Sequence, residues 1–231
     1  MKIPALGLLL IMATGASIAS FAAAAPLEKL VRPAPGVTKI TISTPGDLSV
    51  RPGDDEKVVV EAEAKVLAQL DVSVKGDTLI LASKGSFKTD RGLKYTVTIK
   101  TFRSLKAEGS GSSLIEGFAG ESILVEAAGS GEITLKNIRP EKLTALIPGS
   151  GNINASGSGK LLYARIEGSG NIDTAKFQSK VAEARIDGSG TIRLHADETL
   201  KATIGGAGNI EYKGKAKVTQ SITGAGNIER I

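Results

Sequence analysis

Hydrophobic and polar residues alternate along most of the C-terminal half of this 231-residue chain, and a Gly-x-Gly tripeptide interrupts the alternation at regular intervals. The tripeptide occurs seven times, and its first glycines lie 18 to 20 residues apart. These glycines are Gly109, Gly129, Gly149, Gly168, Gly188, Gly206 and Gly224. A sustained period near twenty residues is typical of repeat proteins, in which each repeat packs on its neighbours.

The residues on both sides of each tripeptide indicate strands. Two and four residues before the first glycine the chain is mostly apolar, and the residue between them is mostly polar, as in Ala164-Arg165-Ile166. Leu146 is the apolar exception at the middle position. In six copies an isoleucine follows two residues after the second glycine, as Ile172 does. Alternation with a period of two predicts strands that have one buried face.

One repeat therefore consists of a strand, a glycine corner, a second strand and a shorter connection. About twenty residues suit one coil of a β-solenoid, in which each strand pairs with its equivalents in the next coils. We expect the corner glycines to be required because a sharp corner needs backbone angles that only glycine adopts freely. The sequence thus predicts an all-β solenoid over residues 105–231.

Residues 37–104 lack the glycine period but keep the strand-like alternation. Asp71–Lys75 and Thr78–Ala82, joined by Gly76-Asp77, form the clearest local hairpin pattern. Terminal repeats of solenoids are usually atypical, because they close the end of the stack. We therefore predict that residues 37–104 form an all-β N-terminal cap or the first coils of a single domain that covers 37–231.

The N-terminus has the pattern of a secretory signal. Lys2 precedes an apolar stretch over residues 6–18, and Ala22-Ala23-Ala24 supplies small residues for cleavage. We predict a signal peptide over residues 1–24 and export to the periplasm, the cell surface or the extracellular space. Residues 25–36 follow as a linker, or as a first cap over 27–36. No second long apolar stretch follows, so no stable membrane insertion is expected after the signal is removed.

Composition argues against several kinds of chemistry. The net charge is +5, but positive and negative residues are interspersed, so nucleic acid is not an expected partner. His195 is the single histidine and there is no cysteine, so we expect no metal site. A strand, rather than a helix, follows each glycine corner, which differs from phosphate-binding loops. We predict no cofactor and no catalytic residues.

Two rows of polar residues are candidate binding groups. The residue after the second glycine is asparagine in four repeats, and an arginine lies three residues before the corner in two adjacent repeats. The candidates are Asn152, Asn171, Asn209, Asn227, Arg165 and Arg185. Stacked asparagines stabilise turns and hydrogen-bond along a ladder, or they present a surface to a ligand. Both interpretations remain open from the sequence.

One pair of carboxylates has a spacing that suits catalysis. Glu167 and Asp187 occupy equivalent positions in adjacent repeats, which predicts a separation of about 5 Å. Such a separation suits the two carboxylates of a retaining glycosidase. Ordinary surface acids balanced by Arg165 and Arg185 are the simpler interpretation.

The GSGNI and GAGNI repeats and the preceding segment DVSVKGDTLIL…YTVTIKTFRSLKAEGSG resemble a bacterial family, the putative auto-transporter adhesin, head GIN domain. The resemblance covers about residues 37–231. It implies a right-handed β-helix of about 20-residue coils and an exported location, and it brings no catalytic residues with it.

Three functions follow from these patterns. The leading prediction is an exported, non-catalytic binding or adhesion module that presents a rigid repeat surface to a polysaccharide or cell-envelope partner. One alternative is a polysaccharide-acting enzyme that uses Glu167 and Asp187. The other is a structural protein that self-associates through the open C-terminal edge of the solenoid.

Overall fold

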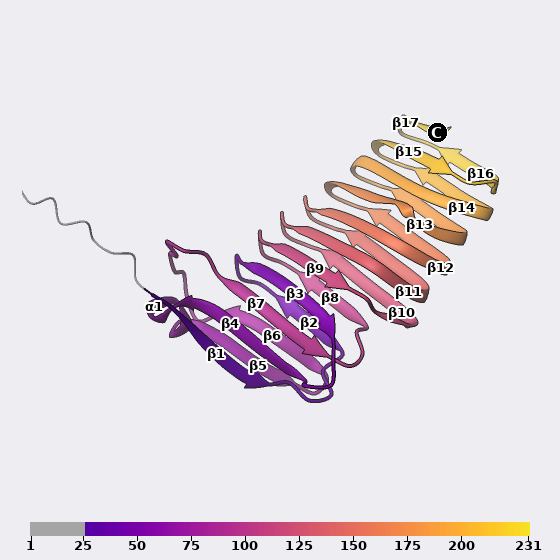
Figure 1. Cartoon of the computed structure of the whole chain (residues 1–231). Coiled ribbons are helices and arrows are strands. Elements are labelled where there is room, and N and C mark those ends of the chain that lie inside the picture. The colour runs from indigo at the N-terminus through magenta and orange to yellow at the C-terminus, as the bar shows by residue number, and fades with distance from the viewer. Residues whose placement is uncertain (1–25) are drawn as a thin grey trace, which may run out of the picture.

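The computed structural model describes residues 26–231, so the predicted signal peptide lies outside the described residues. The chain forms a stack of strands with a cap at one end and the last coil at the other (Figure 1). The predicted all-β solenoid with coils of about twenty residues is confirmed.

One wall of the solenoid, here called the pre-corner sheet, consists of the strands that lead into each corner. Its strands are parallel and keep the repeat register, with Ala145 opposite Ala164 and Ala164 opposite Ala184. The strands are β8 (Ser104–Ala107), β10 (Ala119–Ala127), the second halves of β11 (Glu132–Ile147), β12 (Asn152–Ile166), β13 (Ser169–Ile186) and β14 (Ser189–Ile204), and β16 (Lys217–Ile222).

The facing wall, here called the post-corner sheet, consists of the strands that leave each corner. Its pairing is also parallel, with Ile153 opposite Ile172 and Ile172 opposite Ile192. Besides the first halves of β11–β14, the wall contains β9 (Ser112–Glu116), β15 (Ala207–Lys213) and β17 (Ala225–Arg230). The long strands β11–β14 continue around the third side of the coil and join the two walls.

The first coil precedes the glycine repeats. It consists of β2 (Lys39–Ile42) and β3 (Asp47–Pro52), which pair in parallel with β8 and β9. The strands β6 (Thr78–Ser83) and β7 (Lys94–Ile99) follow later in the chain, yet they stack in parallel on the other side of β2 and β3. The order of coils in space therefore differs from their order in sequence.

Antiparallel strands close this end of the stack. β5 (Leu70–Lys75) pairs with β6, and β4 (Lys57–Glu63) pairs with β7. The hairpin predicted at Gly76-Asp77 is confirmed, with Gly76 at φ 61°. One short helix, α1 (Ala64–Leu67), follows β4.

The N-terminal segment is an element of the cap and not the linker, the other role expected for residues 25–36. Leu27–Pro33 forms β1, which pairs antiparallel with β4 along its whole length. Leu30 packs against the core, and Pro33 ends the strand, where a missing N–H does not interrupt the ladder. The segment folds as an edge strand because the exposed edge of β4 offers it backbone partners.

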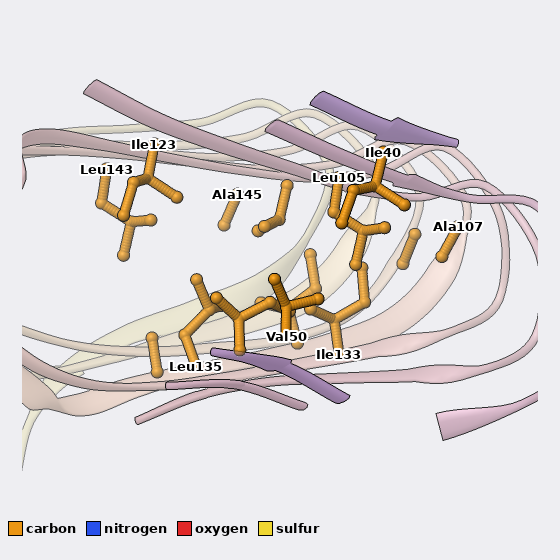
Figure 2. Packing of buried hydrophobic residues seen from close by; sticks show 14 of the residues in the cluster. Ile40, Val50, Leu105, Ala107, Ile123, Ile133, Leu135, Leu143 and Ala145 are labelled. Carbon is orange, nitrogen blue, oxygen red and sulfur yellow. The ribbon is translucent and has the colours of Figure 1, made fainter. Parts of the chain in front are cut away.

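The interior is a narrow apolar layer between the two walls. Ile40, Leu105 and Ile123 extend from one wall toward Val50 and Ile133 of the other, and all are buried (Figure 2). Small and branched side chains suit this thin space. Two of the buried aromatic residues, Phe102 and Phe118, are in contact, with ring centroids 5.4 Å apart.

The corner glycines are required for a different reason from the one expected. Among the corner glycines, Gly190 alone has φ in the left-handed region, at 149°. A Cβ at Gly168 or Gly170 would instead collide with the carbonyl oxygen of Gly149 or Gly151 in the preceding coil. The expectation of unusual backbone angles is therefore wrong at most corners. Close stacking of one corner on the next excludes a side chain at these two glycine positions.

Candidate binding surface

The predicted asparagines occupy one outward row of the post-corner sheet. The register pairs Asn152 with Asn171 and Asn209 with Asn227, and Thr191 lies between the two pairs. All four asparagines are exposed. The sequence spacing therefore placed these side chains correctly in one row.

The asparagine Oδ1 atoms contact the next coil. Asn152 Oδ1 accepts hydrogen bonds from the backbone N–H of Asn171 at 3.2 Å and from its Nδ2 at 3.1 Å. Asn171 Oδ1 accepts from the N–H of Thr191 at 3.1 Å, and Asn209 Oδ1 accepts from the N–H of Asn227 at 3.1 Å. These side-chain bonds join adjacent coils at the corners, in addition to the backbone hydrogen bonds there. The row thus has a clear structural role.

The two predicted arginines lie side by side on the pre-corner sheet, with Arg165 opposite Arg185. Arg165 Nη2 contacts Glu167 Oε1 at 3.0 Å and Asp187 Oδ2 at 2.9 Å. Arg185 donates from Nε to Asp187 Oδ2 at 2.8 Å, and its Nη2 lies 2.6 Å from Asp187 Oδ1. Two guanidinium groups and two carboxylates therefore form one ion-pair network across adjacent coils.

The candidate catalytic pair belongs to the same network. Glu167 and Asp187 both contact Arg165, so the spacing did bring the two carboxylates to one place. The hydrogen bond from Arg185, and then that from Arg165, lower the pKa of Asp187 below its usual range although partial burial opposes the shift. A general acid needs the opposite, a raised pKa. The geometry thus favours the ion-pair interpretation of these acids.

His195 contacts one carboxylate, with its Nε2 atom 3.0 Å from Asp197 Oδ1. Within residues 26–231, no group of three or more histidine, cysteine, aspartate or glutamate side chains is arranged to hold a metal ion.

Sequence reasoning singled out Leu146 as an apolar exception but missed the other outward apolar residues around it on the pre-corner sheet. Leu124 and Leu161 are 37% and 45% exposed, and Leu146, Tyr163 and Val181 are half-buried. They belong to β10–β13. The signal was available, since these residues occupy the outward positions of the alternation, where other repeats have polar residues.

Two shallow hollows border Tyr163 on this sheet. The first has a volume of 270 Å³, and its lining includes Leu146, Pro148, Arg165 and Glu167 besides Tyr163. The second has a volume of 200 Å³ and is lined by Lys142, Leu161, Leu162, Tyr163, Val181 and Glu183. Tyr163 is thus the aromatic residue common to both hollows.

A family model described as "Putative auto-transporter adhesin, head GIN domain" matches residues 36–216. The chain belongs to this family. No curated protein matches the chain. The match begins before β2 and ends before β16, so the GIN domain includes the cap as well as most of the glycine repeats.

Solved structures show the same fold. A putative adhesin from Bacteroides fragilis is 25% identical, with a TM-score of 0.85, covering 89% of this chain and 97% of the other. A putative lipid binding protein from Parabacteroides distasonis is 23% identical, with a TM-score of 0.73, covering 89% and 96%. A putative adhesin from the same organism is 23% identical, with a TM-score of 0.67, covering 90% and 98%. These similarities place this GIN domain among solenoids of one architecture.

The adhesin-like family indicates an exported or surface protein. In the part of the chain that the structure describes, no helix has the length and apolar character needed to cross a membrane.

Proposed function

We propose that the protein is an exported, non-catalytic binding module that presents the outer faces of its solenoid to a polysaccharide or another cell-surface partner. The observation that carries the proposal is the fixed arrangement of polar side chains. The contacts of Asn152 with Asn171, and of Arg165 with Asp187, hold these groups in rows across coils. A surface ordered before binding loses little conformational entropy when a partner docks. The adhesin descriptions of the family and its structural neighbours agree with this function.

The six candidate residues contribute differently. The Oδ1 atoms of Asn152, Asn171 and Asn209 already accept hydrogen bonds from the next coil. The Nδ2 groups of Asn152 and Asn209 have no hydrogen-bond partner within residues 26–231, so they are the donors that this row offers to a ligand. Arg165 and Arg185 offer the edges of guanidinium groups that Asp187 holds in place.

The test is binding of the purified protein to immobilised envelope and extracellular polysaccharides and to whole bacterial cells, at low and high salt. Selective binding that persists at high salt supports the proposal. Binding that disappears as salt is added reflects general attraction between a basic protein and acidic polymers, because salt screens exposed charges. That result, or binding to none of the polymers and none of the whole cells tested, contradicts the proposal.

Assembly through the last coil is the alternative function that a specific observation favours. Within residues 26–231, β17 pairs only with β15, and Ile222 and Ile231 are 43% and 54% exposed. Two residues of the last coil argue against assembly, because they are polar at register positions that hold Ala or Tyr in the preceding coil. Gln220 takes the register position of Ala202, and Arg230 takes that of Tyr212. Charged or polar residues at such positions discourage pairing between exposed sheet edges. We therefore rank assembly below the binding function.

A further inference from the structure

A cluster of apolar side chains lies on the outside of the pre-corner sheet. We call it the Tyr163 surface. It consists of Leu146 on β11, Leu161 and Tyr163 on β12, and Val181 on β13. Leu161 lies opposite Val181 in the register, and Leu146 lies opposite Arg165 in the neighbouring strand. In β14 the outward residue next to Val181 is Thr199, so the apolar cluster ends there. Exposed apolar clusters with a polar border mark ligand or partner sites.

The hollows on either side of Tyr163 combine an apolar floor with fixed polar groups. In the 270 Å³ hollow, Leu146 and Pro148 lie beside Arg165 and Glu167. In the 200 Å³ hollow, the apolar lining is completed by polar groups from the side chains of Lys142 and Glu183. Most ligand sites have this composition, in which a few polar groups orient a ligand on an apolar surface.

The charges of the surface argue against an anionic ligand. Together the two hollows are lined by two cations, Lys142 and Arg165, and by three carboxylates, Glu126, Glu167 and Glu183. Arg165 is already paired with carboxylates at 2.9 and 3.0 Å. Glu183 and Glu126 are likewise paired, with Lys201 and Lys106. The charges around the hollows are therefore balanced, and a phosphate, a nucleic acid or an acidic polymer would meet no excess of positive charge here. The surface is complementary to an uncharged ligand.

We propose, on the basis of the binding function above, that the Tyr163 surface binds a neutral polysaccharide. One sugar ring packs its C–H face on the ring of Tyr163, because the aromatic face carries partial negative charge. Hydroxyl groups of that sugar and its neighbours bond to Arg165, Glu167 and Glu183, which supply both donors and acceptors. A chain can extend across both hollows, since both lie on the outer face of one sheet and share Tyr163.

The direct test follows the tyrosine rings by NMR during titration with neutral oligosaccharides of glucose, mannose, xylose and N-acetylglucosamine. The chain has three tyrosines, and Tyr95 is buried whereas Tyr212 packs against the core. Their signals are assigned with single Tyr→Phe variants. We expect saturable shifts of the Tyr163 signal with at least one oligosaccharide, while the Tyr95 signal stays in place.

Variants separate the aromatic ring from its hydroxyl. Tyr163→Ala should weaken binding about tenfold, the order expected for loss of one aromatic contact. Tyr163→Phe keeps the ring and should remain within about threefold of the wild type. Val74→Ala is the matched control, because Val74 is an exposed apolar residue, at 39%, in β5 of the cap. It should leave binding unchanged, and circular dichroism should show the same fold for all three variants.

Failure of this proposal and failure of the proposed function give different results. If the wild-type protein binds a polysaccharide but Tyr163→Ala binds it equally well, the Tyr163 surface is wrong and the binding function stands. Loss of binding in Asn152→Ala together with that result would place the site on the asparagine row. Tyr163-dependent binding to phosphatidylcholine vesicles, without binding to any glycan, would show that the surface binds lipid and would overturn the proposal of a polysaccharide ligand. No binding to any probe contradicts both proposals.

Discussion

Asn152 Oδ1 accepts two hydrogen bonds from Asn171 of the next coil, one from the backbone N–H at 3.2 Å and one from Nδ2 at 3.1 Å. The contact joins two corners that are 19 residues apart in sequence. A single side-chain oxygen thus adds a contact between two coils to the backbone pairing that joins β12 and β13.

This contact predicts a difference between two substitutions of Asn152. Asn152→Ala should lower the free energy of unfolding by about 1 kcal/mol, because it removes the acceptor of two solvent-exposed hydrogen bonds. Asn152→Asp retains an oxygen acceptor and should keep most of the stability. Urea denaturation followed by circular dichroism measures both values. Equal stability of Asn152→Ala and the wild type would show that the contact contributes nothing.

Close stacking at the corners predicts the effect of adding one methyl group. In Gly170→Ala, the new Cβ would overlap the carbonyl oxygen of Gly151, so the coils must move apart. We expect a loss of about 1–3 kcal/mol or more, as for other substitutions that overfill a packed site.

Gly85→Ala is the matched control for the corner variant. Gly85 has no atom within 4 Å of an added Cβ, and its φ lies outside the left-handed region. Gly170→Ala should therefore lower the midpoint of thermal unfolding by several degrees, whereas Gly85→Ala should leave it unchanged or raise it slightly. A Gly170→Ala protein as stable as Gly85→Ala would contradict the stacking explanation.

The buried carboxylate of Glu63 predicts a pH dependence of stability. Glu63 is 1% exposed and accepts hydrogen bonds from Thr89 Oγ1 at 2.7 Å and from the N–H of Asp90 at 2.8 Å. The hydroxyl of Thr89, followed by the N–H of Asp90, lowers the pKa of Glu63 from 4.5 to about 2. Since the folded pKa is below the unfolded value, this contribution is complete above about pH 4.5 and is lost as the pH falls toward 2.

The measurement is the unfolding midpoint of wild type and Glu63→Gln between pH 7 and pH 2. At pH 7 the variant should be less stable, because an amide is a weaker acceptor than a carboxylate. The difference should shrink as the pH falls below 4.5. Glu121→Gln provides the control, since Glu121 is exposed on β10. A difference between wild type and Glu63→Gln that stays constant with pH would disprove the role of this carboxylate.

The polar residues of the last coil predict that replacing them with apolar residues will increase self-association. Arg230 follows Leu194 and Tyr212 in one register row, and Gln220 follows Ala202 in another. Replacing both, as Arg230→Leu with Gln220→Ala, should convert an exposed edge into an apolar one and shift sedimentation toward a larger species. Arg230→Lys keeps the charge and should sediment as the wild type does. No change in the double variant would mean that other features protect this edge.

The period of the glycine repeat determined most of the solenoid. Equivalent residues such as Ile153 and Ile172 pair in adjacent coils, because a parallel stack needs the same alternation in every repeat. The same period placed the asparagines in one row and brought Arg165 beside Arg185. The hairpin at Gly76-Asp77 was equally local, since a two-residue turn sets the pairing of its strands.

Only the tertiary structure decided the features that join distant segments. The stacking of β6 and β7 on β2 and β3, and the pairing of β1 with β4, join strands that are far apart in the sequence. Neither leaves a periodic signal in the chain. The position of the Asp187 carboxylate between two guanidinium groups, and the hollows beside Tyr163, depend on side-chain conformations across coils. Sequence alternation establishes which face a residue occupies, whereas packing against neighbouring coils determines what that face can bind.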